Sequence, residues 1–112
     1  MKELQDRILA DGKNMGGGIL NVNSFINHQV DCRLMVRIGQ ELASRFASDE
    51  ASKILTAEIS GIGPALEVGV ALGIPVVFAR KIWSITMPAD SFERMVPSHT
   101  KGTMVQLIVA RE

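Results

Sequence analysis

The sequence of residues 53–81, KILTAEISGIGPALEVGVALGIPVVFARK, decides the fold. It has the order strand, glycine-containing turn, helix and second strand, which is the order of a βαβ unit of about 30 residues. Pro64 suits the first turn of a helix, where its missing N–H would have no partner, and Gly73 suits a helix end. The predicted elements are a strand at 54–59, a helix at 65–72 and a strand at 76–79 that is buried on both faces. The stretch therefore predicts an α/β fold with a Rossmann-like parallel sheet.

A turn between the first strand and the helix is a candidate anion site. It consists of Ser60, Gly61, Ile62 and Gly63. Free backbone N–H groups and the positive end of the helix dipole favour a phosphate or diphosphate at such a position. Arg80 and Lys81 end the second strand, and the carboxyl ends of parallel strands share one edge of a sheet. A plain tight turn is the alternative interpretation.

A dinucleotide site fits this stretch less well than another anionic ligand. The dinucleotide fingerprint requires a third glycine, where this chain has Leu66, and an acid near the end of the second strand, where it has Arg80 and Lys81. The turn therefore predicts a ligand rich in negative charge other than NAD.

Composition limits the class of protein. The 112 residues include 12 Lys plus Arg and 12 Asp plus Glu, so the net charge is about zero, which argues against a general nucleic-acid or membrane-surface protein. Cys32 is the single cysteine, which excludes a disulfide within the chain and favours a reducing compartment. The amino terminus lacks the apolar core of a signal peptide. We therefore expect one domain in a cytoplasmic protein.

Residues 1–31 are expected to form a helix and an irregular segment. The helix is predicted at 2–10 with Leu4, Ile8 and Leu9 on one face, and the glycines of 15–18 are predicted to be a flexible connector. Within 19–31, Val22 and Phe25 are expected to anchor a segment whose Asn and His side chains could read the edge of a heterocycle. Ordinary turns with a surface histidine are the alternative.

A second helix is predicted from the N-cap Asp31 to about residue 47. Its apolar residues recur at helical spacing and are expected to pack on the sheet: Met35, Ile38, Leu42 and Phe46. Arg37 and Glu41 are expected to pair on the outer face of this helix.

The carboxyl-terminal segment predicts an antiparallel hairpin, with strands at 92–96 and 104–110. Its polar tip is a candidate lid over the anion site, and an ordinary surface hairpin is the alternative. No nucleophilic triad or metal cluster is recognisable, and Glu58 is a single carboxylate that could assist a ligand site.

Three segments carry a resemblance to a known family. VNSFINHQVD (22–31), LTAEISGIGPA (55–65) and PVVFARK (75–81), followed by Ser84 and Thr86, resemble the matching segments of bacterial xanthine phosphoribosyltransferases. The order and spacing agree over nearly the whole chain. The resemblance implies a type I phosphoribosyltransferase fold, with residues 1–31 forming an amino-terminal helix and hood and residues 32–112 forming the core and lid hairpin of a single domain.

The resemblance also implies an activity and its site residues. The activity is transfer of a phosphoribosyl group from 5-phosphoribosyl diphosphate to xanthine, with Mg²⁺, in a cytoplasmic homodimer. Leu20 and Asn27 would contact the purine, residues 60–63 would receive the pyrophosphate, and Arg80 and Lys81 would contact phosphoribosyl diphosphate. The lid would consist of Ser98, His99, Thr100, Lys101 and Gly102.

One part of the family pattern is missing. The superfamily signature is an apolar strand that ends in two adjacent acids, which hold the ribose hydroxyls, followed by a small-residue loop for the 5-phosphate. The only adjacent acids in the first 111 residues are Asp49 and Glu50, which lie between a predicted helix and a predicted strand. We therefore expect the chain to be the amino-terminal part of an enzyme and to be inactive alone. A non-catalytic purine- or phosphate-binding module and an inert fragment are the alternatives.

Overall fold

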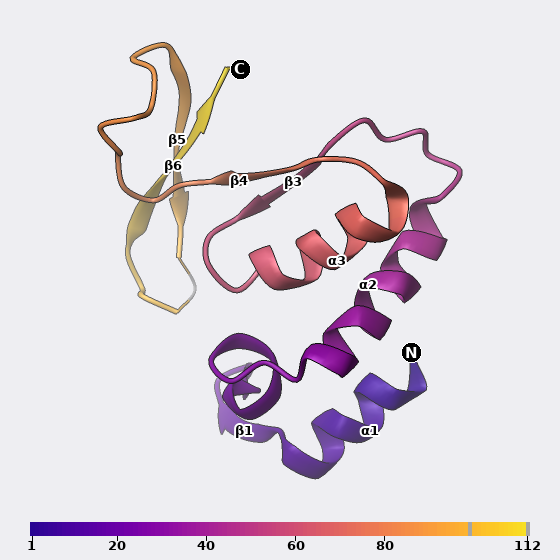
Figure 1. Ribbon diagram of the computed structural model, residues 1–112. Helices are drawn as coiled ribbons and strands as arrows, with labels where there is room; N and C mark the ends of the chain where they lie inside the picture. Colours follow the sequence, from indigo (N-terminus) through magenta and orange to yellow (C-terminus); the bar gives the residue numbers. More distant parts are fainter. Residues whose placement is uncertain (99, 112) are drawn as a thin grey trace.

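Three pairs of strands and a set of helices follow one another along the chain (Figure 1). The computed structural model describes residues 1–98 and 100–111. The elements are α1 (Lys2–Asp11), β1 (Lys13–Gly16), β2 (Ile19–Asn21), the π-helix η1 (Asn23–Asn27), α2 (Cys32–Phe46), β3 (Ile54–Ala57), α3 (Ile62–Leu72), β4 (Val76–Ala79), β5 (Ser91–Pro97) and β6 (Met104–Ala110). None of the described helices is both long enough and apolar enough to cross a membrane.

The predicted βαβ unit is confirmed. Strands β3 and β4 are parallel and in continuous register, from Ile54 opposite Val76 to Ala57 opposite Ala79. Helix α3 connects them and ends at Gly73, whose φ of 70° places it in the left-handed region. The helix begins at Ile62, three residues earlier than predicted, because the second half of the turn already has helical geometry.

The prediction that β4 is buried on both faces is wrong. Helix α3 packs on one face of the β3–β4 pair, where Val76 and Ile54 approach Gly69. Side chains alternate between the faces of a strand, so Leu55 lies on the opposite face and is 68% exposed. Phe78 shares the face of Val76, which α3 covers only in part, and is 42% exposed. A parallel strand is buried on both faces only when helices cover both sides of its sheet, and the described residues cover one side in part.

Helix α2 packs against α3 rather than on the sheet, which corrects the second-helix prediction (Figure 1). The contact is close because Gly39 has no side chain: a Cβ atom there would lie 2.2 Å from the Cβ of Glu67. The apolar stripe of α2 is therefore divided. Met35 and Ile38 are buried, whereas Phe46, at the end of the helix, is 51% exposed.

The amino-terminal region closes a core against the start of α2. Phe25 of η1 is fully buried and contacts a cluster that includes Leu34 and Met35, and Val22 packs beside it, as predicted. Helix α1 contributes Leu4 and Ile8 to the same cluster. Leu9 is 83% exposed, so its predicted place on the buried face is wrong.

A β-hairpin replaces the flexible connector predicted at 15–18. Strands β1 and β2 are antiparallel, and Gly17 and Gly18 form the two-residue turn with φ of 59° and 78°. Two successive positive φ angles are the requirement of a type I′ hairpin turn, which glycine meets without steric cost. The glycines that indicated flexibility are therefore the residues that allow this turn.

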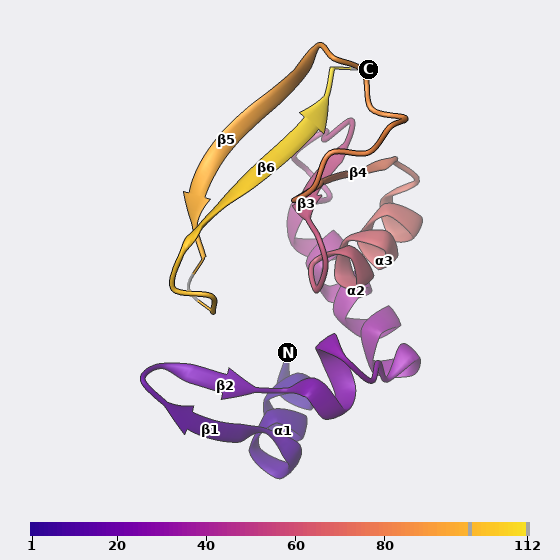
Figure 2. The same cartoon turned by 90° about the vertical axis from the view of Figure 1, so that its left-hand side faces the viewer.

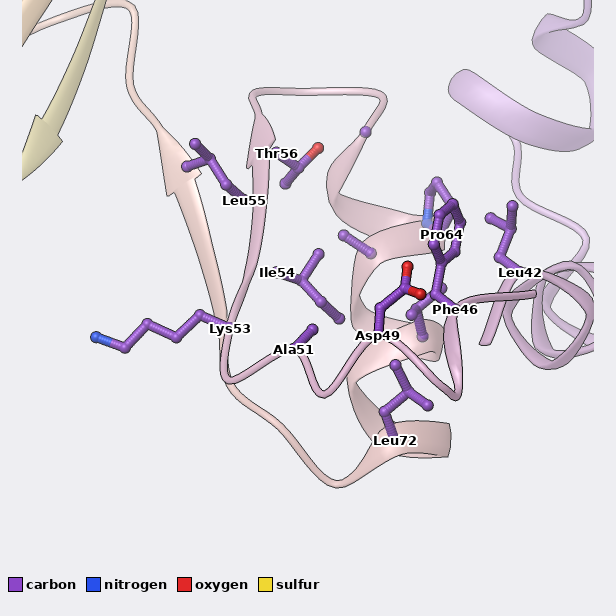
Figure 3. A pocket seen from close by; sticks show the side chains of 13 residues that line it. Leu42, Phe46, Asp49, Ala51, Lys53, Ile54, Leu55, Thr56, Pro64 and Leu72 are labelled. Atoms are coloured by element: carbon purple, nitrogen blue, oxygen red, sulfur yellow. The ribbon is translucent and has the colours of Figure 1, made fainter. Parts of the chain in front are cut away.

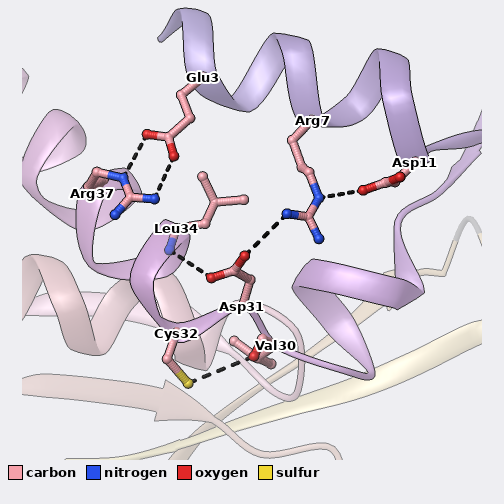
Figure 4. Close-up of polar contacts among 8 residues, drawn as sticks. All are labelled: Glu3, Arg7, Asp11, Val30, Asp31, Cys32, Leu34 and Arg37. Carbon is pink, nitrogen blue, oxygen red and sulfur yellow. Dashed lines mark hydrogen bonds and ion pairs between the residues drawn. The ribbon is translucent and has the colours of Figure 1, made fainter.

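Ion pairs join α1 to the start of α2 (Figure 4). The Arg37 guanidinium donates to the Glu3 carboxylate, with Nε 2.6 Å from Oε2, and lowers the pKa of that carboxyl. Asp31 is the predicted N-cap: it accepts from the Leu34 amide at 3.1 Å, which lowers its pKa, and Arg7 adds a second attraction. The predicted Arg37–Glu41 pair is wrong, because Arg37 reaches across to α1.

Strands β5 and β6 form the predicted antiparallel hairpin, in register from Ser91 opposite Ala110 to Pro97 opposite Met104. One isolated bridge joins the hairpin to the end of β4: the amides of Arg80 and Ile108 each donate to the other residue's carbonyl at 2.8 Å. In Figure 2 the β5–β6 hairpin and the β1–β2 hairpin lie on the same side of the helices.

Candidate anion-binding site

A hollow of about 330 Å³ lies between the carboxyl end of the β3–β4 sheet and the β5–β6 hairpin. We call it the cationic hollow, because Lys81 and Lys101 contribute two positive charges against the single negative charge of Glu58. Its lining consists of Glu58, Ile59, Lys81, Ile82, Lys101, Val105 and Gln106. The fold thus places a lysine from the end of β4 and a lysine from the predicted lid in one hollow.

The predicted anion turn, residues 60–63, directly follows the Glu58–Ile59 side of this hollow. The Ile62 amide donates to the Ile59 carbonyl at 3.1 Å. One of the four backbone N–H groups of the turn therefore already has an acceptor. Gly61 allows the turn to lie close to β3, since a Cβ atom there would be 2.3 Å from the Thr56 hydroxyl oxygen. The turn leads into α3, as an anion site at a helix N-terminus requires.

The two basic residues that end β4 are placed differently. The main chain of Arg80 pairs with Ile108, its side chain is half-buried, and its Nε is buried without a hydrogen-bond partner among the described residues. Lys81 lines the cationic hollow, and its backbone amide donates to Glu58 Oε1 at 2.6 Å. Of the two predicted contacts to phosphoribosyl diphosphate, Lys81 is the one that the hollow contains.

The tip of the hairpin is held by its own hydrogen bonds. The Ser98 amide donates to the Thr103 carbonyl at 2.9 Å, and the Gly102 amide donates to the Ser98 carbonyl at 3.0 Å. Thr100 and Gly102 lie in the turn beside Lys101, whose side chain lines the hollow. His99 was also predicted to belong to the lid, and it lies outside the described residues.

The two residues predicted to contact a purine lie in the amino-terminal region. Leu20 is in β2 and is 47% exposed, and Asn27 is the last residue of η1 and is exposed. Neither lines the cationic hollow. Their predicted role stays a prediction.

A second hollow, of about 430 Å³, is almost entirely apolar (Figure 3). We call it the apolar hollow; Leu42 and Phe46 of α2, Ile54 of β3 and Leu72 of α3 are among its lining residues. Asp49 and Lys53 also line this hollow, and their charges are opposite. A hydrophobic hollow without excess positive charge does not suit a phosphorylated ligand, although it is the larger of the two.

Gln106 of β6 lines the cationic hollow and was not singled out from the sequence. The sequence contains only an indirect signal for the position of Gln106. Residue 106 could be placed beside Lys81 only after the antiparallel register of the hairpin and its bridge to Arg80 were known.

Comparison with known proteins identifies relatives along the whole chain. The xanthine phosphoribosyltransferase of Lactiplantibacillus plantarum is 46% identical over 112 residues, which are 100% of this chain and 57% of that protein. The xanthine phosphoribosyltransferase of Brevibacillus brevis is 40% identical over 112 residues, again 100% of this chain and 57% of the relative. The chain thus spans a little over half the length of these curated relatives. No protein-family model matches the chain.

Solved structures agree on the fold at much lower identity. The APRTase of Giardia lamblia complexed with 9-deazaadenine superposes with a TM-score of 0.68 at 15% identity, covering 96% of this chain and 59% of that one. The adenine phosphoribosyltransferase of Saccharomyces cerevisiae gives a TM-score of 0.62 at 19% identity, covering 97% and 63%. The chain is therefore homologous along its whole length to part of the xanthine phosphoribosyltransferases, and its α/β fold is that of the type I phosphoribosyltransferases.

Proposed function

We propose that this chain supplies the diphosphate site and part of the purine site of a xanthine phosphoribosyltransferase. The observation that supports the proposal most directly is the meeting of Lys81 and Lys101 in the cationic hollow, next to the turn at 60–63. Two ammonium groups and free backbone amides are suited to a leaving diphosphate. Homology to proteins named xanthine phosphoribosyltransferase supports the choice of substrates.

The reaction would replace one bond at ribose C1 by another. The bond between ribose C1 and the diphosphate oxygen breaks, a bond forms between C1 and N9 of xanthine, and the proton of the xanthine imidazole ring leaves to solvent or to the pyrophosphate, giving XMP and pyrophosphate. This chain's residues would stabilise the negative charge that collects on the departing pyrophosphate, which is electrostatic rather than acid–base catalysis. Leu20 would cover one face of the purine and the Asn27 amide would meet its polar edge, as the family resemblance implies.

Mg²⁺ is expected to come with the diphosphate substrate. Among the described residues no three His, Cys, Asp or Glu side chains are grouped as a metal site, so the donors would be largely phosphate oxygens. When bound, the ion would neutralise charge on the diphosphate. We also propose that the enzyme works as a cytoplasmic homodimer, as the resemblance implies.

Pyrophosphate binding to the 112-residue chain tests the site. Isothermal titration should give a dissociation constant that Lys81→Ala raises about tenfold, because the variant removes one charged contact to the anion. Lys53→Ala is the matched control, since Lys53 precedes β3 at the opposite end of the sheet. Equal weakening by both variants, or no effect of Lys81→Ala, would contradict the proposed site.

A further inference from the structure

The hydrogen-bond ladder between β3 and β4 continues one step beyond the strands. In this parallel pair the Ile54 amide donates to the Pro75 carbonyl at 3.0 Å, and the Glu58 amide donates to the Ala79 carbonyl at 3.1 Å. The two bonds have the same offset in residue number, so Glu58 stands opposite Arg80 in the register of the strands.

The next bond of a parallel ladder would run from the Lys81 amide to the main-chain carbonyl of Glu58. The structure has a different acceptor: the Lys81 amide donates to Oε1 of the Glu58 side chain at 2.6 Å. The chain turns away from β4 after Glu58, and the carboxylate takes the place of the main-chain oxygen. Glu58 thus binds Ala79 through its own amide and Lys81 through its side chain.

The neighbouring amide explains why Lys81 needs this acceptor. Backbone groups of successive strand residues point to opposite edges, and the Arg80 amide points to β6, where Ile108 accepts it at 2.8 Å. The Lys81 amide therefore points back toward β3, at the level where that strand has already ended. Without an acceptor this half-buried amide would be unsatisfied, and the main chain of Lys81 would no longer be held in place by the hydrogen bond.

We propose that Glu58 is a positioning residue of the diphosphate site, which fixes the main chain of Lys81 so that its ammonium group stays in the cationic hollow. The inference rests on the proposed function for the identity of the anion. Glu58 accepts a hydrogen bond from the Lys81 amide and acts on the anion only through Lys81, without contact to the reacting atoms. Since an amide oxygen also accepts, the role should survive Glu58→Gln and fail in Glu58→Ala.

Amide hydrogen exchange and pyrophosphate titration on the full 112-residue chain test this role together. The Lys81 amide should exchange slowly in the wild type and in Glu58→Gln, and at least about tenfold faster in Glu58→Ala. The Arg80 amide, which is bound to Ile108, is the internal control and should keep its protection in all three proteins. Glu93→Ala is the matched variant, because Glu93 is an exposed β5 residue that does not line the hollow.

The affinity for pyrophosphate should fall in the same variant in which the Lys81 amide exchanges faster. We expect the dissociation constant of Glu58→Ala to be about tenfold higher than that of Glu58→Gln, because both variants remove the same negative charge from the cationic hollow and only Gln keeps an acceptor for the Lys81 amide; Glu93→Ala should differ from the wild type by less than about twofold. Equal affinity in Glu58→Ala and Glu58→Gln, or loss of Lys81 protection in Glu58→Gln, would overturn the proposal. If the wild type does not bind pyrophosphate, the proposed function fails for this chain, and the exchange rates alone still decide whether Glu58 holds Lys81.

Discussion

The amino-terminal region and the β3–α3–β4 unit differ in how far they bury their apolar side chains. In the first, Phe25 is fully buried and Leu34 is 2% exposed beneath α1. In the second, Leu55 is 68% and Phe78 is 42% exposed, and Leu55 also lines the apolar hollow. The amino-terminal core is built from segments close in sequence, whereas a parallel sheet needs flanking layers from distant segments. Local sequence can therefore complete the first region but not the second.

The largest effect predicted from this contrast concerns catalysis. Incubated with xanthine, phosphoribosyl diphosphate and Mg²⁺, the 112-residue chain should form XMP at least about 10²-fold more slowly than a full-length relative, because the described residues contain no strand ending in paired acids to fix the ribose. Chromatographic detection of XMP provides the measurement. Turnover equal to that of the relative would show that the β3–α3–β4 unit is sufficient as it stands.

Truncating a side chain in each region compares their cores directly. Phe25→Ala should destabilise the chain by about 3–5 kcal/mol, because it leaves a cavity in a closed cluster. Leu55→Ala should change the free energy of unfolding by less than about 0.5 kcal/mol, since most of that side chain is already in water. Urea unfolding followed by circular dichroism measures both, and similar losses would remove the distinction between the two regions.

The smallest effect should appear with pH in the amino-terminal region. The pKa values of Glu3 and Asp31 are lowered, the first by the hydrogen bond from Arg37 and the second by the Leu34 amide. A carboxyl whose pKa is lower in the folded state contributes stability above its unfolded pKa, and this contribution is lost as the pH falls through the folded value.

Amide exchange measured across acidic pH should therefore show α1 and the first turn of α2 losing protection before α3. Glu3→Gln should remove part of that pH dependence, and Glu93→Gln, on exposed β5, is the control. Simultaneous loss of protection in α1 and α3 would contradict the assignment to these ion pairs.

The sequence predicted the elements whose signals are local. Pro64 lies in the first turn of the helix and Gly73 ends it, as expected; Asp31 is the N-cap, and Phe25 is an anchor of the core. Features that depend on contacts between distant segments were missed. The composition of β4 indicated burial on both faces, but burial of Phe78 depends on layers that the described residues do not supply.

The candidate site was predictable to a similar degree. The turn at 60–63 and Lys81 follow from the βαβ pattern, whereas the approach of Lys101 and Gln106 to Lys81 depends on how the hairpin crosses the end of β4. Arg37 shows the same limit for ion pairs. Its neighbour at helical spacing was Glu41, but Glu3, 34 residues away, is its partner.

The isolated bridge between Arg80 and Ile108 has a mechanical consequence for the β5–β6 hairpin. Seven residue pairs along β5 and β6 make the hairpin itself stiff, but only one residue pair, Arg80 with Ile108, joins the described part of the hairpin to the end of β4. One pair of hydrogen bonds fixes a pivot point and leaves the angle about it to side-chain packing. Ile108, which is fully buried, lies at that pivot. A change in its volume would therefore rotate the tip, and Lys101 with it, while the register of the hairpin stays the same.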